Sequence, residues 1–290
     1  MQYVFSGLTI GSIYAVVAIG FNIIYASTGI INFAQGEFVM LGGMIAFSFS
    51  RHIPLLFAVI LAVLITVVIG SVVELAFIRP LLSPSVLRMI IVTIGLSIII
   101  REIALHVWDE KIRAPRFFTG NEVTSIKIFN AFISPQVLWV LGITTCIVAG
   151  LYIFFTFTLT GQAMRACSAN RIAAGLCGIN TRWMVNLSFS LSAGIGALAG
   201  CVISPLTQTH YAVGTELAIK GFTVAILGGL GNSTAAVTAG VILGLIESFS
   251  ISILPMAYKD VVAIAILLLV LFFKPTGLFG SRQTARLKEF

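Results

Sequence analysis

The chain is a series of long apolar runs separated by short polar connections. The runs cover residues 3–25, 30–50, 54–78, 86–106, 136–157, 183–203, 217–230, 234–253 and 260–273. Most of them have the length of about 20 residues that a helix needs to cross a bilayer. Their residues do not alternate as barrel strands do, and in lipid only helices and closed barrels satisfy their backbone hydrogen bonds. The pattern therefore predicts an all-α, polytopic membrane helix bundle.

The number of spans depends on the shortest run. Residues 217–230 are few for a bilayer core of about 30 Å, so this run is expected to be tilted, locally thinned or re-entrant. We expect about eight to ten membrane-spanning helices. Glycines four positions apart, at Gly7 and Gly11 and at Gly240 and Gly244, predict helices that pack closely.

Composition agrees with this pattern. The chain has 290 residues, of which 59% are hydrophobic and 9% charged, and its mean hydropathy is +1.10. Such a chain cannot cover a water-facing surface with polar groups. Because the runs use nearly the whole length, we expect one transmembrane domain over residues 1–290 and no soluble catalytic domain. The net charge of +7 comes mainly from residues in connections and near run ends, so membrane orientation explains it better than nucleic-acid binding.

One connection, residues 160–182, has an unusual composition. It combines small residues with a few arginines and lies between two apolar runs. Small residues allow another protein to approach closely and arginines can orient it, which is typical of the segment by which a permease docks on a separate ATPase. The residues expected to carry this coupling role are Gly161, Arg165, Ala166, Arg171 and Gly178.

This docking segment also sets the expected orientation, because basic residues divide almost evenly between the two sets of connections. If residues 160–182 are cytoplasmic and the run 217–230 spans the membrane, the N-terminus and the connection 107–135 lie outside and the basic C-terminal tail lies inside. Within that external connection, residues 123–134 alternate weakly. A small hairpin and an irregular loop are equally compatible with this stretch.

Several polar residues fall within membrane depth. If the second span began after Glu37, only residues 38–50 would remain, which is about 20 Å of helix and too short to cross. Glu37, with Asn32 and Gln35 beside it, must therefore face protein or water, and an intramembrane carboxylate is a functional candidate. We assign these residues and Asn22 to the substrate pathway. The alternatives are a structural carboxylate bonded to a neighbouring helix and, for Asn22, a helix-joining hydrogen bond.

Lys220 and Glu247 form a second group of charges at matched depths on consecutive runs. They could pair across the two helices. Snorkelling of Lys220 and an interhelical hydrogen bond from Glu247 are the alternatives, and a structural pair is favoured over a transport role.

No catalytic or metal site is expected. The chain has no G-x-x-x-x-G-K-[ST] phosphate loop, so it cannot bind ATP in that way. The three histidines are isolated from one another, and the four cysteines lack CxxC or zinc-like spacing. We therefore expect free thiols and no metal.

Four motifs taken in order carry a family resemblance. They are Gly7-Leu8-x-x-Gly11-x-x-Tyr14-Ala15, then Gly29-x-x-Asn32-Phe33-Ala34-Gln35-Gly36-Glu37, then residues 161–180, and finally Lys220-Gly221-Phe222 leading into Leu227-Gly228-Gly229-Leu230-Gly231-Asn232. With them the chain resembles the branched-chain amino acid permeases of ABC importers over nearly its whole length.

The resemblance implies a multi-pass subunit of the cytoplasmic (inner) membrane that is not an enzyme. Its partners would be a second homologous permease, two cytoplasmic ATPase subunits and an extracytoplasmic substrate-binding protein, in addition to the lipid bilayer. This chain would bind no cofactor, since ATP and Mg would reside on the partner ATPases. Transport would proceed by alternating access. Many relatives carry an acidic residue near Asn170, and this chain does not.

Two other classes stay open on the sequence. A secondary transporter or channel for a small polar solute such as urea, an amide or another amino acid would also explain Glu37 and the glycine-rich segments. A membrane scaffold would account for the glycine packing, but it leaves Glu37 unexplained.

Overall fold

Helices make up nearly all of the described structure. The computed structural model describes residues 1–81, 86–121, 124–128, 131–252, 255, 258–274 and 277–279. The helices are α1 (Gln2–Thr28), α2 (Gln35–Phe49), α3 (Leu55–Val73, continuing through Ile78), α4 (Val86–Trp108), α5 (Pro135–Phe157), α6 (Leu159–Ala169), α7 (Arg171–Leu176), α8 (Thr181–Thr207), α9 (Val213–Gly228), α10 (Ser233–Ser250) and α11 (Lys259–Phe273). The all-α, polytopic class predicted from the apolar runs is confirmed.

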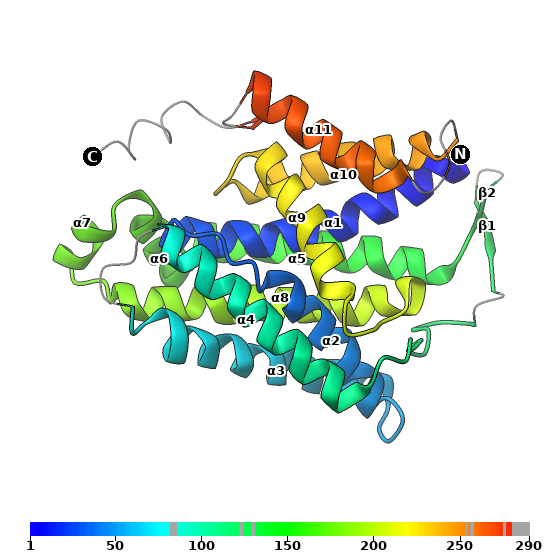
Figure 1. The fold of residues 1–290 in the computed structure, drawn as a ribbon, viewed down its shortest axis with the longest axis horizontal. Coiled ribbons are helices and arrows are strands. Elements are labelled where there is room, and N and C mark those ends of the chain that lie inside the picture. The colour runs from blue at the N-terminus through cyan, green and yellow to red at the C-terminus, as the bar shows by residue number, and fades with distance from the viewer. Residues whose placement is uncertain are drawn as a thin grey trace.

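The long helices run along the longest axis of the molecule (Figure 1). The N-terminus lies at one end, together with an antiparallel pair of strands, β1 (Ile126–Ile128) and β2 (Ala131–Ile133). The short helices α6 and α7 lie at the opposite end. The connection 107–135 therefore contains a hairpin, the first of its two alternatives, although residues 122–123 and 129–130 are outside the described part.

Six of the described helices are long and apolar enough to cross a membrane, namely α1, α3 with its extension, α4, α5, α8 and α10. Helices α2, α9 and α11 are shorter, with 15, 16 and 15 residues. The short run at 217–230 corresponds to α9. Residue 253, the expected end of the run 234–253, and the basic tail from residue 280 onward lie outside the described residues.

The second apolar run is not one continuous helix, which corrects the expectation for residues 30–50. Gly29 adopts a left-handed conformation (φ 71°) that ends α1. The Asn32 side chain then accepts a hydrogen bond from the backbone N–H of Ala34 in a local turn, and α2 begins only at Gln35. Apolar Ile30 and Ile31 lengthen the run without adding helix. Glu37 therefore lies in the first turn of a short, buried helix.

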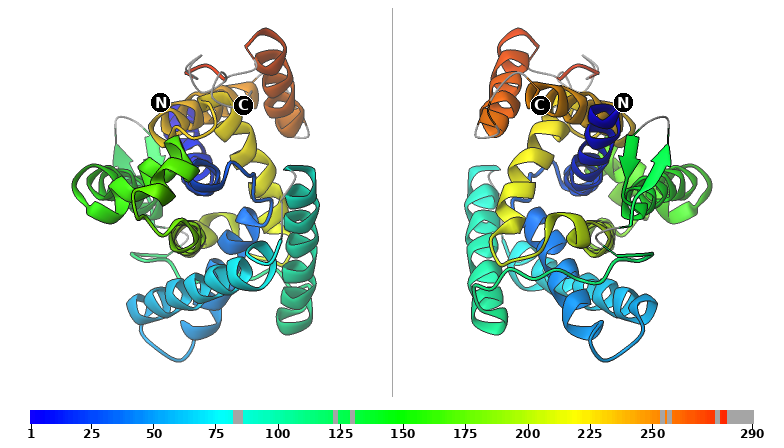
Figure 2. Two further views of the ribbon diagram at one scale, coloured as in Figure 1. Left: turned by 90° about the vertical axis from the view of Figure 1, so that its left-hand side faces the viewer. Right: turned by 90° about the vertical axis from the view of Figure 1, so that its right-hand side faces the viewer.

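Helices α1 and α8 lie at the centre of the bundle and α3, α4 and α5 at its periphery (Figure 2). In the most apolar 18-residue windows, 72% of α1 and of α8 is buried, against 22% of α4 and 17% of α5. The exposed residues of the peripheral helices are mostly large and apolar. This distribution suits helices whose outer surface contacts hydrocarbon rather than water.

The glycines four positions apart bring α1 and α10 into close contact. A Cβ on Gly11 would lie 2.6 Å from the carbonyl oxygen of Gly240, and one on Gly244 would lie 2.4 Å from that of Gly7. The two pairs face each other across one interface. Close helix approach of this kind depends on residues without side chains.

Candidate functional site

Glu37 connects three helices inside the protein. Its side chain is completely buried. The hydroxyls of Ser97 on α4 and Thr215 on α9 both donate to its Oε1, at 2.9 Å and 3.3 Å. No described group bonds to its Oε2, which points toward Gly214 at the start of α9.

The surroundings of Glu37 only partly compensate its charge. Arg101, one helical turn beyond Ser97 on α4, attracts the carboxylate electrostatically. A carboxylate at the centre of a membrane helix costs about 2.5–3.5 kcal/mol on insertion scales, and partners reduce that cost. Two hydroxyls and one nearby cation serve this purpose here, while the second oxygen stays unpaired among the described residues.

Gln35 and Asn32 precede Glu37 but contact other parts of the bundle. Gln35 exchanges hydrogen bonds with Ser192 on α8: the Ser192 hydroxyl donates to Gln35 Oε1 at 2.6 Å, and Gln35 Nε2 donates to the Ser192 carbonyl at 3.3 Å. Asn32 uses its oxygen in the turn before α2, and its Nδ2 has no partner in the described structure. Both side chains are fully buried.

Asn22 holds the turn between α9 and α10. Its Nδ2 donates to the carbonyl of Asn232 at 3.2 Å, and its Oδ1 accepts from the backbone N–H of Gly231 at 3.1 Å. The four proposed pathway residues thus do not form one cluster. Glu37 faces α4 and α9, Gln35 faces α8, and Asn22 faces the α9–α10 turn.

A cavity of about 620 Å³ opens beside Asn22. It lies between α1, α5, α6 and the start of α10, and Asn22, Arg165, Ser168 and Thr234 are among the polar residues that line it. The sequence gives no sign of this cavity, because its walls come from segments far apart along the chain. It connects the predicted docking segment with the α9–α10 turn.

The docking segment forms two helices joined at Asn170. The Thr158 side chain accepts from Gly161 N–H at the start of α6, and the Asn170 side chain accepts from the N–H groups of Ile172 and Ala173 at the start of α7. Such caps satisfy free backbone donors at helix starts. The segment is therefore a defined two-helix element.

The predicted coupling residues divide into two groups. Arg165, Ala166, Arg171 and Gly178 are exposed at this end of the molecule. Gly161 is buried, and a Cβ there would lie 2.1 Å from the Phe154 carbonyl oxygen, so its role in the structure is packing against the end of α5.

Three large apolar side chains on this element were not singled out from the sequence. Leu159, Ile172 and Leu176 are 85%, 78% and 85% exposed. For α6, the helical spacing of Gly161, Met164 and Cys167 could have indicated which side of the helix faces inward, because these three residues are the buried ones.

The structure brings Lys220 and Glu247 together within a larger network. Lys220 Nζ lies 3.0 Å from Glu247 Oε1 and 2.7 Å from Asp260 Oδ1, and Lys259 Nζ lies 3.3 Å from Glu247 Oε1. The Tyr14 hydroxyl also donates to Glu247 Oε1 at 3.2 Å. These contacts join α1, α9, α10 and α11, and only the α9–α10 pair was expected from the sequence.

Comparison with known proteins places this architecture in a family. The family model described as the branched-chain amino acid transport system permease component matches residues 3–271. The high-affinity branched-chain amino acid transport system permease protein BraD of Pseudomonas aeruginosa is 33% identical, with 99% of this chain and 97% of that protein covered. LivH of Escherichia coli K12, described in the same words, is 32% identical over the same shares.

A solved structure has the same fold. PsaBC from Streptococcus pneumoniae in complex with Fab superposes with a TM-score of 0.51 at 12% identity, covering 95% of this chain and 93% of that one. With its candidate membrane helices, the chain is a multi-pass protein of the cytoplasmic membrane. It belongs to the family of permease components of branched-chain amino acid transport systems.

Proposed function

We propose that this chain is the transmembrane permease subunit of an ATP-driven ABC importer that carries branched-chain amino acids. Its partners are a second homologous permease, two cytoplasmic ATPase subunits and an extracytoplasmic substrate-binding protein. The chain is not itself an enzyme and binds no cofactor, because ATP and Mg are bound by the ATPases. Alternating access follows when ATP binding draws the ATPases together and the permeases reopen on the other side.

The observation that carries this proposal is the two-helix element α6–α7. It lies at one end of the bundle with exposed arginines and exposed apolar side chains (Figure 1). A transporter that uses only an ion gradient has no need of such a surface, whereas a permease powered by a separate ATPase must present one. The relatives named for branched-chain amino acid transport supply the substrate class.

We further propose that Asn22, Asn32, Gln35 and Glu37 border the translocation route. Support comes from their depth and from the unpaired atoms Asn32 Nδ2 and Glu37 Oε2. Asn22 also lines the cavity next to α6. All four side chains are buried in the single chain, so the route at their level opens when the permeases move.

Reconstitution tests the proposed function. The chain, the second permease, both ATPases and the binding protein are placed in vesicles, and uptake of labelled leucine is measured with and without ATP. We expect ATP-dependent uptake that isoleucine and valine inhibit, with urea and short amides as negative controls. Uptake that follows a proton or sodium gradient in the absence of the ATPases would assign the chain to the secondary transporters instead.

A further inference from the structure

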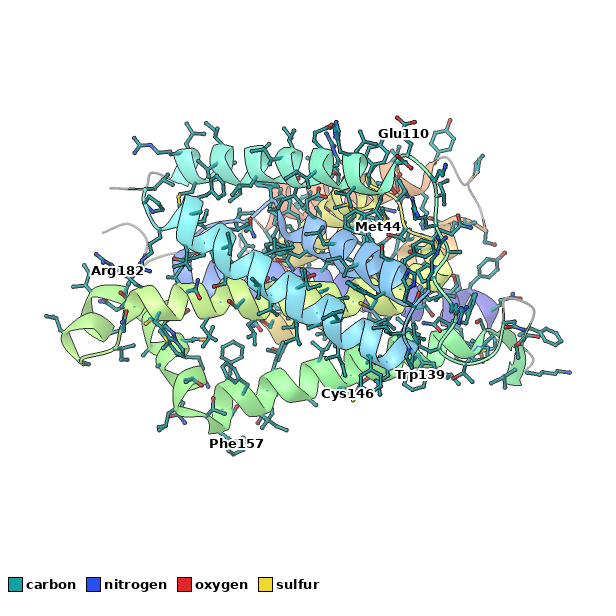
Figure 3. The ribbon with its side chains drawn as sticks, turned by 90° about the horizontal axis from the view of Figure 1, so that it is seen from below. Met44, Glu110, Trp139, Cys146, Phe157 and Arg182 are labelled. Atoms are coloured by element: carbon teal, nitrogen blue, oxygen red, sulfur yellow. The ribbon has the colours of Figure 1, made fainter. Side chains whose placement is uncertain are left out.

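Among the described helices, α4 and α9 expose acidic side chains that the apolar helices α3 and α5 lack. Helices α3 and α5 contain no charged residue between their bounds. Helix α4 exposes Glu102 and His106, and α9 exposes Glu216. Figures 2 and 3 place α4 and α5 at opposite edges of the molecule. The two edges therefore differ in chemistry.

Glu102 cannot reach water from where it lies if α4 is surrounded by lipid. It is six residues before Trp108, the last residue of α4, which corresponds to about 9 Å at 1.5 Å per residue. A glutamate side chain is too short to cover that distance, unlike the long lysine and arginine side chains that snorkel. Facing hydrocarbon would leave this carboxylate without water or a partner, which is unfavourable. This side of α4 is therefore covered by protein or water.

Helix α9 extends the same surface. Ser97 on α4 and Thr215 on α9 donate to one oxygen of Glu37, so both helices contact the same buried carboxylate. Glu216 follows Thr215 directly, and Ile219, one turn further along α9, is 53% exposed. We call the surface formed by Ile98, Glu102, His106, Glu216 and Ile219 the α4–α9 face.

The chemistry of the α4–α9 face restricts what can cover it. A protein that covers Glu102 at this depth must itself lie within the membrane. A two-fold interface with a second copy would use the same patch on both sides, and that patch carries two carboxylates against the single imidazole of His106. The face fits a different chain that presents hydrogen-bond donors or cations.

We propose that the α4–α9 face binds the second, related permease of the complex, and that donor side chains of that partner contact Glu102 and Glu216. This inference rests on the proposed function, because it takes its partner from the importer assembly. It also places Glu37, one layer behind the face, next to the boundary between the two permeases.

Photo-crosslinking in the assembled importer tests the location. A benzophenone amino acid is introduced at Ile98 or Glu102 on the face and, as matched controls, at Val68 on α3 or Ile153 on α5, which are 60% and 55% exposed. With a different tag on each chain, we expect adducts with the second permease from positions 98 and 102 and none from 68 or 153. Lipid adducts alone from 98 and 102, equal crosslinking from the controls, or adducts between two copies of this chain would overturn the proposal.

Charge reversal tests the chemistry independently. Glu102→Lys is expected to reduce co-purification of the second permease about tenfold, which corresponds to about 1.4 kcal/mol. Glu110→Lys is the control, because Glu110 is exposed in the external connection just beyond α4 (Figure 3). Unchanged co-purification of Glu102→Lys would contradict the role of the carboxylate. Leucine uptake by the wild-type importer distinguishes the two hypotheses. If uptake is observed but the crosslinks to the second permease are not, only this interface is rejected. If the wild-type importer takes up no leucine, the proposed function is rejected.

Discussion

At the scale of single residues, Glu37 is a carboxylate that the bundle encloses but does not fully pair. Its Oε1 accepts two hydrogen bonds, from helices α4 and α9, and its Oε2 accepts none within the described structure. Unsatisfied buried polar groups are rare because each costs about 1–3 kcal/mol. One that persists in the middle of a transport protein is a candidate for a contact made in another conformation.

Two substitutions of Glu37 separate transport from stability. Glu37→Gln retains an oxygen that can accept from Ser97 and Thr215, so the importer should assemble normally while leucine uptake falls about tenfold. Glu37→Leu removes the acceptor of both hydroxyls and should also lower the melting temperature. Uptake in vesicles and unfolding in detergent measure the two effects. Wild-type uptake by Glu37→Leu would show that the residue has no part in the route.

The Lys220–Glu247 network predicts unequal single effects. The Glu247 side chain is 1% exposed and forms ion pairs with Lys220 and Lys259, whereas the Lys220 side chain is 17% exposed. Glu247→Ala should therefore destabilise more than Lys220→Ala, because it leaves two cations facing each other without their shared anion. The double variant should differ from the sum of the singles by about 0.5–3 kcal/mol.

A thermal-unfolding cycle in detergent measures this coupling. Asp260→Ala is the matched control, since it removes the other carboxylate of Lys220 but from a side chain that is 71% exposed. It should change stability little, because exposed ion pairs contribute little. Strict additivity of the Lys220 and Glu247 substitutions would argue that their contact carries no energy.

At the scale of elements, the α6–α7 pair should transmit the motion of the ATPases. Arg165→Glu together with Arg171→Glu places acidic groups where the permease is expected to meet an acidic cleft. We expect a fully assembled complex in which loaded binding protein no longer stimulates ATP hydrolysis and leucine uptake is lost. Arg116→Glu, which changes an exposed arginine in the connection 107–135, is the control. Unchanged uptake by the double variant would reject the coupling role.

The α1–α10 contact gives a second prediction at this scale. A Cβ on Gly244 would lie 2.4 Å from both the backbone nitrogen of Gly11 and the carbonyl oxygen of Gly7. Gly244→Ala should therefore cost about 1–3 kcal/mol through overpacking. Gly142→Ala on α5 meets no atom within 4 Å and should be neutral or slightly stabilising, because alanine favours helix. Equal melting temperatures for the two variants would show that the helices separate without cost.

At the scale of the whole molecule, the proposed orientation is testable with thiols. Lys127→Cys in β1 should react with a membrane-impermeant maleimide in intact cells, whereas native Cys177, exposed just after α7, should react only after the inner membrane is opened. Burial raises the pKa of the Cys167 thiol despite nearby Arg171, so this cysteine should stay protonated and unreactive. Labelling of Cys177 in intact cells would invert the topology.

Much of this architecture follows from local information. Apolar runs of bilayer length predict spanning helices wherever they occur, and glycines four apart predict close packing, because both depend on residues near each other in the chain. The small, arginine-containing segment 160–182 indicated a docking element for the same reason. This segment divides into two helices at Asn170, whose side chain caps the second helix. The sequence alone does not reveal that one helix ends and another begins at this residue.

The sequence by itself determined the class of protein, the approximate positions of its helices and the residues too polar for lipid. Only the tertiary structure decided which of those residues meet. In the folded chain, Glu37 accepts hydrogen bonds from Ser97 and Thr215, and Asn22 bonds to the α9–α10 turn. Glu247 accepts a hydrogen bond from Tyr14 and pairs with Lys259. The run 30–50 became a turn and a short helix, and Glu102 became a surface residue. The physical reason is that hydropathy depends on each residue alone, whereas hydrogen-bond partners and exposure depend on helices brought together from distant parts of the chain.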